Sequence, residues 1–236
     1  GETVLADSSA EVSGGKGANQ AVAASRLGGH VTMVGRVGDD LFGERLLEDL
    51  DRDNLDTSRV RLTENCASGM AVVSVEDSGE NSIVVIPGAN NRITPKDVAM
   101  AEHAISDCDV LLMQLEIPHA SVAMALEVAR RHGVRTILNP APVSGPLPSD
   151  LLDVDVVCPN QSEASALVER TIHSREDALD AVLQLTRMGP KAAIVTMGAD
   201  GAAFSNGQQA EWCEPFPVEA VDTTATGDAF AGALAV

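Results

Sequence analysis

The segment best suited to chemistry lies near the end of the chain, where Asp228 follows Thr226 and Gly227 at the expected start of a small-residue helix. The first backbone N–H groups of a helix have no partner within the helix, so they attract an anion. Gly227 has no Cβ, which lets a phosphate group come close to the backbone. An anion site beside one carboxylate suits phosphoryl transfer to a hydroxyl, with Asp228 as the general base. Taken alone, Asp228 is also explained as a first-turn acid stabilised by the helix dipole.

A glycine-rich segment near the start of the chain has the properties of a sugar site. Residues 14–20 read Gly-Gly-Lys-Gly-Ala-Asn-Gln. Glycines let sugar hydroxyls approach the backbone, and an Asn side chain both donates and accepts hydrogen bonds, which suits neighbouring hydroxyls. The candidate sugar contacts are therefore Gly14, Gly15, Lys16 and Asn19. The alternative is a glycine-rich turn before a helix, with Asn19 in solvent.

Together, in this order and at opposite ends of the chain, the two segments resemble the two signature motifs of the ribokinase-like carbohydrate kinase family. The resemblance covers essentially the whole chain. It implies that ATP is the phosphoryl donor and that Asp228 takes the proton of a sugar hydroxyl as it attacks the γ-phosphate. It also implies that the N–H groups of Ala225, Thr226 and Gly227 stabilise the transferred group and that Asp228 contacts the sugar.

The early motif, with the Asn-Pro-Ala-Pro sequence of residues 139–142, is most similar to the branch of this family that phosphorylates ribose. The implied reaction is the conversion of D-ribose to D-ribose 5-phosphate. A related kinase of deoxyribose, fructose or a nucleoside remains an alternative. A non-catalytic sugar- or nucleotide-binding relative is another alternative, although the intact Gly227 and Asp228 argue against it.

The resemblance assigns further roles around this site. It makes Glu116 a sugar contact, and it gives Asn160 and Glu163 the task of organising Mg²⁺ and phosphate through water. A hydrated Mg²⁺ needs few direct protein ligands, so two residues are sufficient. Glu116 is alternatively a plain acid before the helix that starts at Pro118. Asn160 and Glu163 are alternatively a helix N-cap and a first-turn acid.

The remaining assignments concern the nucleotide and a monovalent cation. With Asn160, the residues Thr196, Gly198 and Gly201 resemble the family's nucleotide-binding loop, and a tight turn between two strands is the alternative. Asp222 and Thr224 match part of the family's site for a potassium ion.

Alternating apolar and amphipathic segments predict an α/β fold, with a mostly parallel sheet covered by helices on both faces. Polar loops follow the expected strands, and ligands bind at that end of parallel strands. Helices are expected at 98–105 after the start signal Thr94-Pro95, from Pro118 to Gly133, and from Ser174 to Gly189. Strands are expected at 31–37, 110–113, 136–138, 154–158 and 192–196.

One part of the chain departs from this alternation. Residues 69–75 and 81–87 flank a turn-rich stretch and predict a β-hairpin. The resemblance implies that this hairpin is a lid over the sugar and a possible homodimer contact, with a further lid strand from Glu2 to Val12. The expected organisation is therefore an α/β kinase domain of residues 13–67 and 89–236, with lid segments 1–12 and 68–88.

Composition excludes several other partners. The 236 residues carry a net charge of −19 and only 2% aromatic residues, which argues against nucleic-acid binding and against an anionic membrane surface. The four cysteines form no C-x-x-C pair, and no apolar stretch is long enough to span a membrane. We therefore expect a cytoplasmic protein, and the resemblance implies that its partners are a small sugar and ATP.

The two ends of the sequence raise a further expectation. The chain starts Gly-Glu-Thr-Val without Met, and it stops inside an expected helix. We therefore expect a piece of a longer protein, incomplete at both ends of the kinase domain. The resemblance implies an upstream strand with a sugar-binding acid and downstream helices around the adenine, so we expect this piece alone to have little or no activity.

Overall fold

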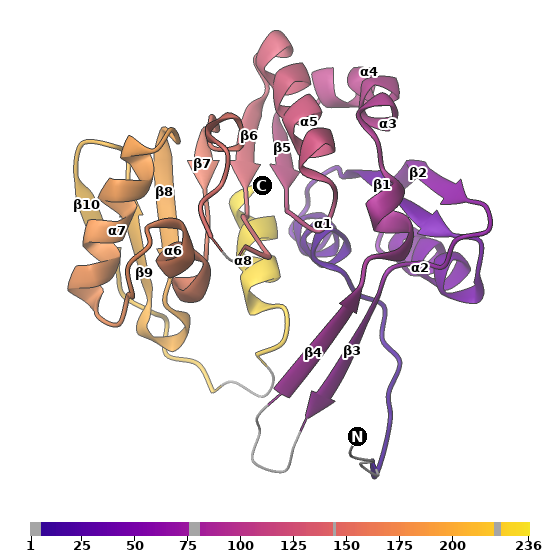
Figure 1. The fold of residues 1–236 in the computed structure, drawn as a ribbon, viewed down its shortest axis with the longest axis horizontal. Helices are drawn as coiled ribbons and strands as arrows, with labels where there is room; N and C mark the ends of the chain where they lie inside the picture. Colours follow the sequence, from indigo (N-terminus) through magenta and orange to yellow (C-terminus); the bar gives the residue numbers. More distant parts are fainter. Residues whose placement is uncertain (1–5, 76–80, 144, 220–222) are drawn as a thin grey trace.

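The computed structural model describes residues 6–75, 81–143, 145–219 and 223–236. A six-stranded sheet forms its centre, in the order β10-β9-β8-β7-β6-β5 (Figure 1). Strands β5 to β8 are parallel, whereas β9 and β10 are antiparallel additions at one edge. The strands are β5 (Val110–Met113), β6 (Arg135–Leu138), β7 (Val156–Val157), β8 (Ala192–Thr196), β9 (Ala202–Ser205) and β10 (Ala210–Cys213).

This sheet confirms the predicted fold class. The predicted strands 110–113 and 192–196 match β5 and β8. β7 is shorter than the predicted strand 154–158, although an isolated bridge between Asn160 and Thr196 continues the parallel pairing beyond it. β9 and β10 are additional to the predicted strands.

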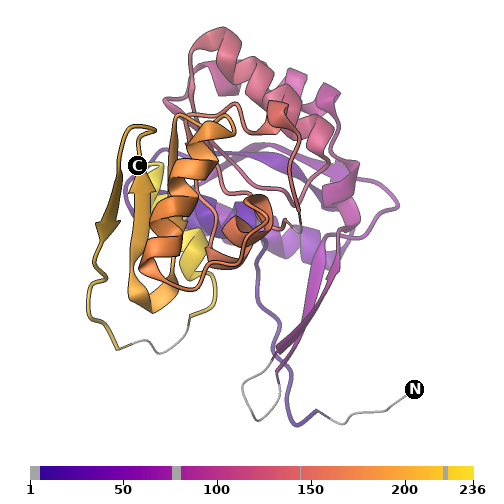
Figure 2. The ribbon, with the colours of Figure 1, turned by 60° about the vertical axis from the view of Figure 1, so that its left-hand side comes forward.

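Helices flank the sheet. In Figure 1, α5 (His119–His132), α6 (Gln161–Leu167) and α7 (Arg175–Arg187) lie in front of the strands, and α8 (Thr226–Leu234) lies behind them, as Figure 2 also shows. α1 (Lys16–Arg26) packs against α8. The core between sheet and helices is aliphatic, and its members include Val122, Leu126, Leu138, Val157, Val182, Leu185 and Val195.

The helix boundaries follow the predicted signals. Ser174 accepts the backbone N–H of Asp177 and starts α7, and Gly133, with a φ of 71°, ends α5 in the left-handed conformation. Thr94 and Asp97 form the corresponding capping box before α3. The predicted helix 98–105 is divided at buried Ala101 into α3 (Pro95–Met100) and α4 (Glu102–Ser106). The 3₁₀ turns are η1 (Gly88–Arg92), η2 (Ser149–Leu151) and η3 (Gly198–Asp200).

The predicted strand 31–37 forms, but it does not join the central sheet. It is β1 (Thr32–Gly38), which pairs in parallel with β2 (Asp56–Thr63) across α2 (Leu41–Arg52). Within the described residues, β1 pairs only with β2 and β5 pairs only with β6. Residues of both β1 and β5 line a cavity of about 3190 Å³.

A buried ionic cluster joins β1 and β2 to α3. Asp97, whose side chain is 5% exposed, accepts hydrogen bonds from Arg36 (2.7 Å) and Arg61 (2.6 Å) and from Thr94 (2.8 Å). Burial disfavours the charged form of Asp97, but the hydrogen bonds from Arg36 and Thr94 outweigh burial and hold its pKa well below its usual range. The carboxylate is therefore charged and links two parts of the chain.

Replacing Asp97 by Asn is expected to lower the free energy of unfolding by about 3 kcal/mol at neutral pH, because Arg36 would keep a buried charge without a partner. A carboxyl group with a lowered folded-state pKa stabilises the fold above its unfolded pKa, which is about 4, and that stabilisation is lost as the pH falls further. The difference between the Asp97→Asn variant and the parent should therefore shrink below about pH 4.

Urea unfolding at several pH values measures this difference. Asp153→Asn is the matched control, because Asp153 pairs with Arg130 at an exposed site, where an ion pair contributes less than about 1 kcal/mol. Equal losses in the two variants at neutral pH would contradict the assignment of a stabilising buried cluster.

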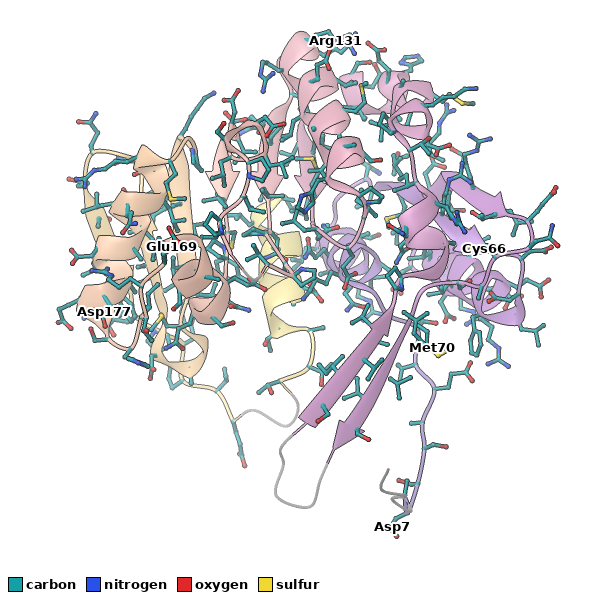
Figure 3. All side chains as sticks on the ribbon, in the orientation of Figure 1. Asp7, Cys66, Met70, Arg131, Glu169 and Asp177 are labelled. Atoms are coloured by element: carbon teal, nitrogen blue, oxygen red, sulfur yellow. The ribbon has the colours of Figure 1, made fainter. Side chains whose placement is uncertain are left out.

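The predicted hairpin consists of β3 (Met70–Val75) and β4 (Asn81–Ile86), and it projects away from the rest of the molecule (Figure 1). Its apolar side chains point to both sides of the ribbon, starting at Met70 (Figure 3). Val72, Val73, Ile83, Val84 and Val85 are each at least 50% exposed. The hairpin leaves much of its apolar surface exposed. Burial of that surface therefore contributes little to its stability.

The strand predicted from Glu2 to Val12 is wrong for the part that the structure describes. Residues 6–12 form no strand, and residues 1–5 lie outside the described residues. Asp7, Ser8 and Ser9 have low strand propensity, which explains the absence.

Among the helices of the described residues, none is both long and apolar enough to cross a membrane.

Candidate active site

The start of α8 forms an open backbone site, as the sequence predicts. Ala225 is its N-cap in the left-handed conformation (φ 57°), and Gly227 has no atom within 4 Å of the position of a Cβ. A ligand therefore has space in front of this helix end. The N–H of Thr226 does not face the open site as predicted. It points to the carbonyl oxygen of Thr223 at 3.4 Å.

The glycine-rich segment runs into the start of α1. Gly15 adopts a φ of 97°, which favours glycine, and the backbone N–H of Lys16 donates to Oε2 of Glu116 at 2.9 Å. Gly14, Gly15 and Glu116 line the large cavity together with hairpin residues such as Met70. The structure thus brings Lys16 of the glycine-rich segment into contact with Glu116, two of the predicted sugar contacts.

Close packing of α1 on α8 brings the two motifs together. A Cβ on Gly232 of α8 would lie 2.5 Å from the carbonyl oxygen of Gln20 and 2.7 Å from Cβ of Ala23. Only glycine fits at such a distance. The result is a hydrogen bond of 3.0 Å from Nδ2 of Asn19 to Oδ2 of Asp228, across 209 positions of sequence.

Asp228 itself is 7% exposed and accepts hydrogen bonds on both carboxylate oxygens. Asn19 donates to Oδ2, and Nε2 of Gln20 donates to Oδ1 at 2.9 Å. Each carboxylate oxygen thus receives one amide donor. The structure places Asp228 beside Asn19, one of the predicted sugar contacts, at the start of α8.

The Asn160–Glu163 pair forms the capping box of α6. Oδ1 of Asn160 accepts the N–H of Glu163, and Oε2 of Glu163 accepts the N–H of Asn160, both at 2.9 Å. Burial raises the pKa of Glu163; the Asn160 hydrogen bond and the charge of Lys16 oppose that shift, and the charge of Asp228 adds to it. Glu163 therefore interacts electrostatically with Lys16 and Asp228.

These groups fit a hydrated Mg²⁺. A buried carboxyl group with a raised pKa becomes easier to ionise when a cation is bound beside it. No cluster of three His, Cys, Asp or Glu side chains suited to a metal occurs in the described parts of the chain. Glu163 is the residue that would hold such an ion through water, and this role stays a prediction.

The predicted nucleotide loop is a tight turn between β8 and β9. Gly198 and Gly201 have φ values of 59° and 118°, and a Cβ on Gly201 would lie 2.4 Å from the carbonyl oxygen of Cys213. Thr196 at the end of β8 bridges to Asn160, so both predicted nucleotide residues lie at one end of the sheet. The turn explains the glycines, and their contact with a nucleotide stays a prediction.

The predicted potassium site is only partly visible. Asp222 lies outside the described residues, and Thr224 is exposed in the segment before α8. The assignment of both residues to a cation stays a prediction.

Comparison with known proteins identifies the family. All 236 residues match the model of the pfkB family of carbohydrate kinases. The chain belongs to the pfkB family. It is 38% identical over 222 residues to a ribokinase of Staphylococcus aureus, with 94% of this chain and 73% of that protein covered. It is 36% identical over 236 residues to a deoxyribokinase of Salmonella typhimurium, with 100% of this chain and 77% of that protein covered.

A solved structure leads to the same family. The structure of Arabidopsis thaliana ribokinase complexed with ribose and ATP is similar to this one with a TM-score of 0.89 and 31% identity, and the match covers 99% of this chain and 77% of that chain. The resemblance inferred from the two motifs is thereby confirmed. This pfkB-family protein is a phosphotransferase with an alcohol group as acceptor.

Three polar residues of this pfkB-family chain join the site, although the sequence assigned them no individual role. Gln20, Gln114 and Asn139 form a chain of side-chain hydrogen bonds that ends at Asp228. A signal for Gln20 exists in the sequence, because it precedes Ala21 and Ala24 on the small-residue face of α1, where a polar residue needs a partner. Nothing local in the sequence indicates which partners it finds.

Proposed function

We propose that this pfkB-family protein is an ATP-dependent kinase that converts D-ribose to D-ribose 5-phosphate. The observation that carries the proposal is the meeting of Asn19, from the glycine-rich motif, with Asp228 at the start of α8. This contact places a candidate sugar residue beside a candidate base and an anion site. The S. aureus ribokinase and the Arabidopsis ribokinase complexed with ribose and ATP support ribose and ATP as the substrates.

In the proposed mechanism, Asp228 accepts the proton of the ribose 5-hydroxyl as its oxygen attacks the γ-phosphorus of ATP. The new O–P bond forms, the bond to the β-phosphate oxygen breaks, and ADP leaves. The N–H groups of Ala225 and Gly227 stabilise the transferred phosphoryl group, because the helix start concentrates positive partial charge there. The N–H of Thr226 joins them only if it leaves the carbonyl oxygen of Thr223.

Other residues are proposed to bind the two substrates. Gly14, Gly15, Lys16, Asn19 and Glu116 would hold the sugar hydroxyls. The nucleotide would lie against the residues at the ends of β7 and β8, which are Asn160, Thr196, Gly198 and Gly201.

The proposal includes two ions. Mg²⁺, when bound, would neutralise charge on the phosphates, and Glu163 would hold it through water. Asp222 and Thr224 would contribute to a potassium site beside the anion site.

The deciding experiment measures ADP release by the full-length protein, with D-ribose, deoxyribose, fructose and adenosine as acceptors. We expect the highest kcat/KM with ribose, and a loss of turnover when Mg²⁺ or potassium is omitted. Higher kcat/KM with deoxyribose would keep the mechanism and overturn the substrate; the 36% identity with the deoxyribokinase makes deoxyribose the second candidate. No turnover with any acceptor, from folded protein that binds ATP, would favour a non-catalytic relative.

The hairpin β3–β4 is proposed to be a lid over the sugar and a homodimer contact, with residues 13–67 and 89–236 as the kinase domain. Its exposed valines and isoleucines support this assignment, because exposed apolar surface of this kind marks contact sites. Sedimentation should then give the mass of a dimer, and a monomer at micromolar concentration would contradict it.

A cytoplasmic location is also proposed, and the four unpaired cysteines support it.

A further inference from the structure

Gln20 is an amide with no exposed surface at the contact between α1 and α8. A buried amide destabilises the fold unless its polar atoms are hydrogen-bonded. Its side chain makes three hydrogen bonds, and all three are directed into the site. Its Nε2 donates to Oδ1 of Asp228 and to Oδ1 of Asn139, both at 2.9 Å, and its Oε1 accepts from Nε2 of Gln114.

The chemistry of the neighbours determines which way round the Gln20 amide lies. The carbonyl oxygen of Cys158 can only accept, so Asn139 must direct its NH₂ group there, at 2.7 Å. Oδ1 of Asn139 then faces Gln20 and also requires a donor. The carboxylate of Asp228 requires a donor as well. Both neighbours therefore demand the NH₂ group of Gln20, and the reversed amide would place oxygen against two oxygens.

The two amide donors on Asp228 come from different environments. Asn19 is half-buried and is a candidate sugar contact, whereas Gln20 has no exposed surface. One donor on each carboxylate oxygen opposes rotation of the carboxylate plane. Each oxygen keeps a second lone pair, so a substrate hydroxyl still has a place to donate its proton.

We infer that Gln20, oriented by Asn139, is a positioning residue that holds the Asp228 carboxylate in the plane required for proton transfer. The inference rests on the proposed function, since it assigns Asp228 as the base. Gln20 acts through Asp228 and touches neither substrate. Its loss should therefore reduce the rate of the chemical step and leave substrate binding nearly unchanged.

The first test replaces Gln20 with Met, which has a similar length and no hydrogen-bond donor. With the acceptor that the protein uses, kcat should fall roughly 10- to 100-fold, as expected for the loss of one hydrogen bond to a charged group. KM for sugar and for ATP should stay within about twofold of the parent. Gln184→Met is the matched control, because Gln184 is a hydrogen-bonded helical glutamine that bonds to the backbone of Val168. Its kcat should equal that of the parent.

The second test uses Asn139→Ala, which removes the group that orients Gln20 and keeps the Gln20 contact with Asp228. A water molecule in the vacated space can both donate and accept, so the Gln20 amide would no longer be held one way round. The expected fall in kcat is smaller than that of Gln20→Met. The double variant should be no slower than Gln20→Met alone, because both residues act through one contact. Additive losses would overturn the role of Asn139.

Crystal structures of the parent and of Gln20→Met separate this inference from the proposed function. Asp228 should have one side-chain orientation in the parent and a rotated or divided one in the variant. A parent without kinase activity would refute the proposed function, and these structures would still decide whether Gln20 positions Asp228. An unchanged kcat together with an unmoved Asp228 would overturn the inference. If Gln20→Met fails to fold, an unchanged kcat in Asn139→Ala would overturn it.

Discussion

Replacing Asp228 with Asn is expected to reduce kcat by about 10²- to 10⁴-fold, which is the usual contribution of a general base. The substitution keeps the shape of the side chain and removes its ability to take a proton. One of its two polar atoms would also become an NH₂ group that faces the amide donor of Asn19 or Gln20. A stability loss of about 1–2 kcal/mol should accompany the loss of rate. ADP release and thermal unfolding measure the two effects.

Asp177→Asn is the matched control for this prediction. Asp177 occupies the third position of α7, as Asp228 does in α8, and there it closes a capping box with Ser174 far from the site (Figure 3). Hydrogen bonds from His173 and Ser174 lower its pKa, so its charge stabilises the helix start. This variant should lose a small part of its stability, because the capping box is weakened, and keep its kcat. If Asp228→Asn behaved in the same way, Asp228 would be only a helix-start acid.

Gly232→Val should separate the two motifs and thereby reduce both stability and activity. The new side chain would meet the carbonyl oxygen of Gln20 and the Cβ of Ala23, at 2.5 Å and 2.7 Å from its Cβ. Because the nearest atom is helix backbone, α8 must move away from α1. Overpacking of this kind lowers the free energy of unfolding by about 1–3 kcal/mol. The bonds from α1 to Asp228 would lengthen, so kcat should fall at least tenfold.

Ala233→Val is the control for Gly232→Val. Ala233 is the next residue of α8 and is exposed, so its extra carbon atoms meet solvent. Its stability should change by about 0.5 kcal/mol, which reflects helix propensity alone. Thermal unfolding and kcat measured on both variants test the role of the helix contact. Equal stabilities and rates in the two variants would contradict it.

Local signals were sufficient for much of the fold. The strands at 110–113 and 192–196 are short apolar runs, and buried parallel strands have that pattern. Gly133 and Ser174 mark helix ends through the backbone conformation and hydrogen bonds of a single residue. Such features depend on a few neighbouring residues, so the sequence alone predicts them.

Pairing between distant segments was not predictable in this way. The apolar run at 31–37 is a strand by its own pattern, but its partner β2 and its separation from β5 depend on which edges meet in space. That pairing is not contained in the residues of the segment itself.

The sequence by itself determined the family motifs, the α/β class and the identity of Asp228 as the candidate base. Only the tertiary structure decided what surrounds that base. Asn19 and Gln20 reach Asp228 across 209 and 208 positions, because Gly232 allows two helices to touch. Hydrogen-bond partners at such separations follow from the packing of whole elements, and no local pattern encodes them.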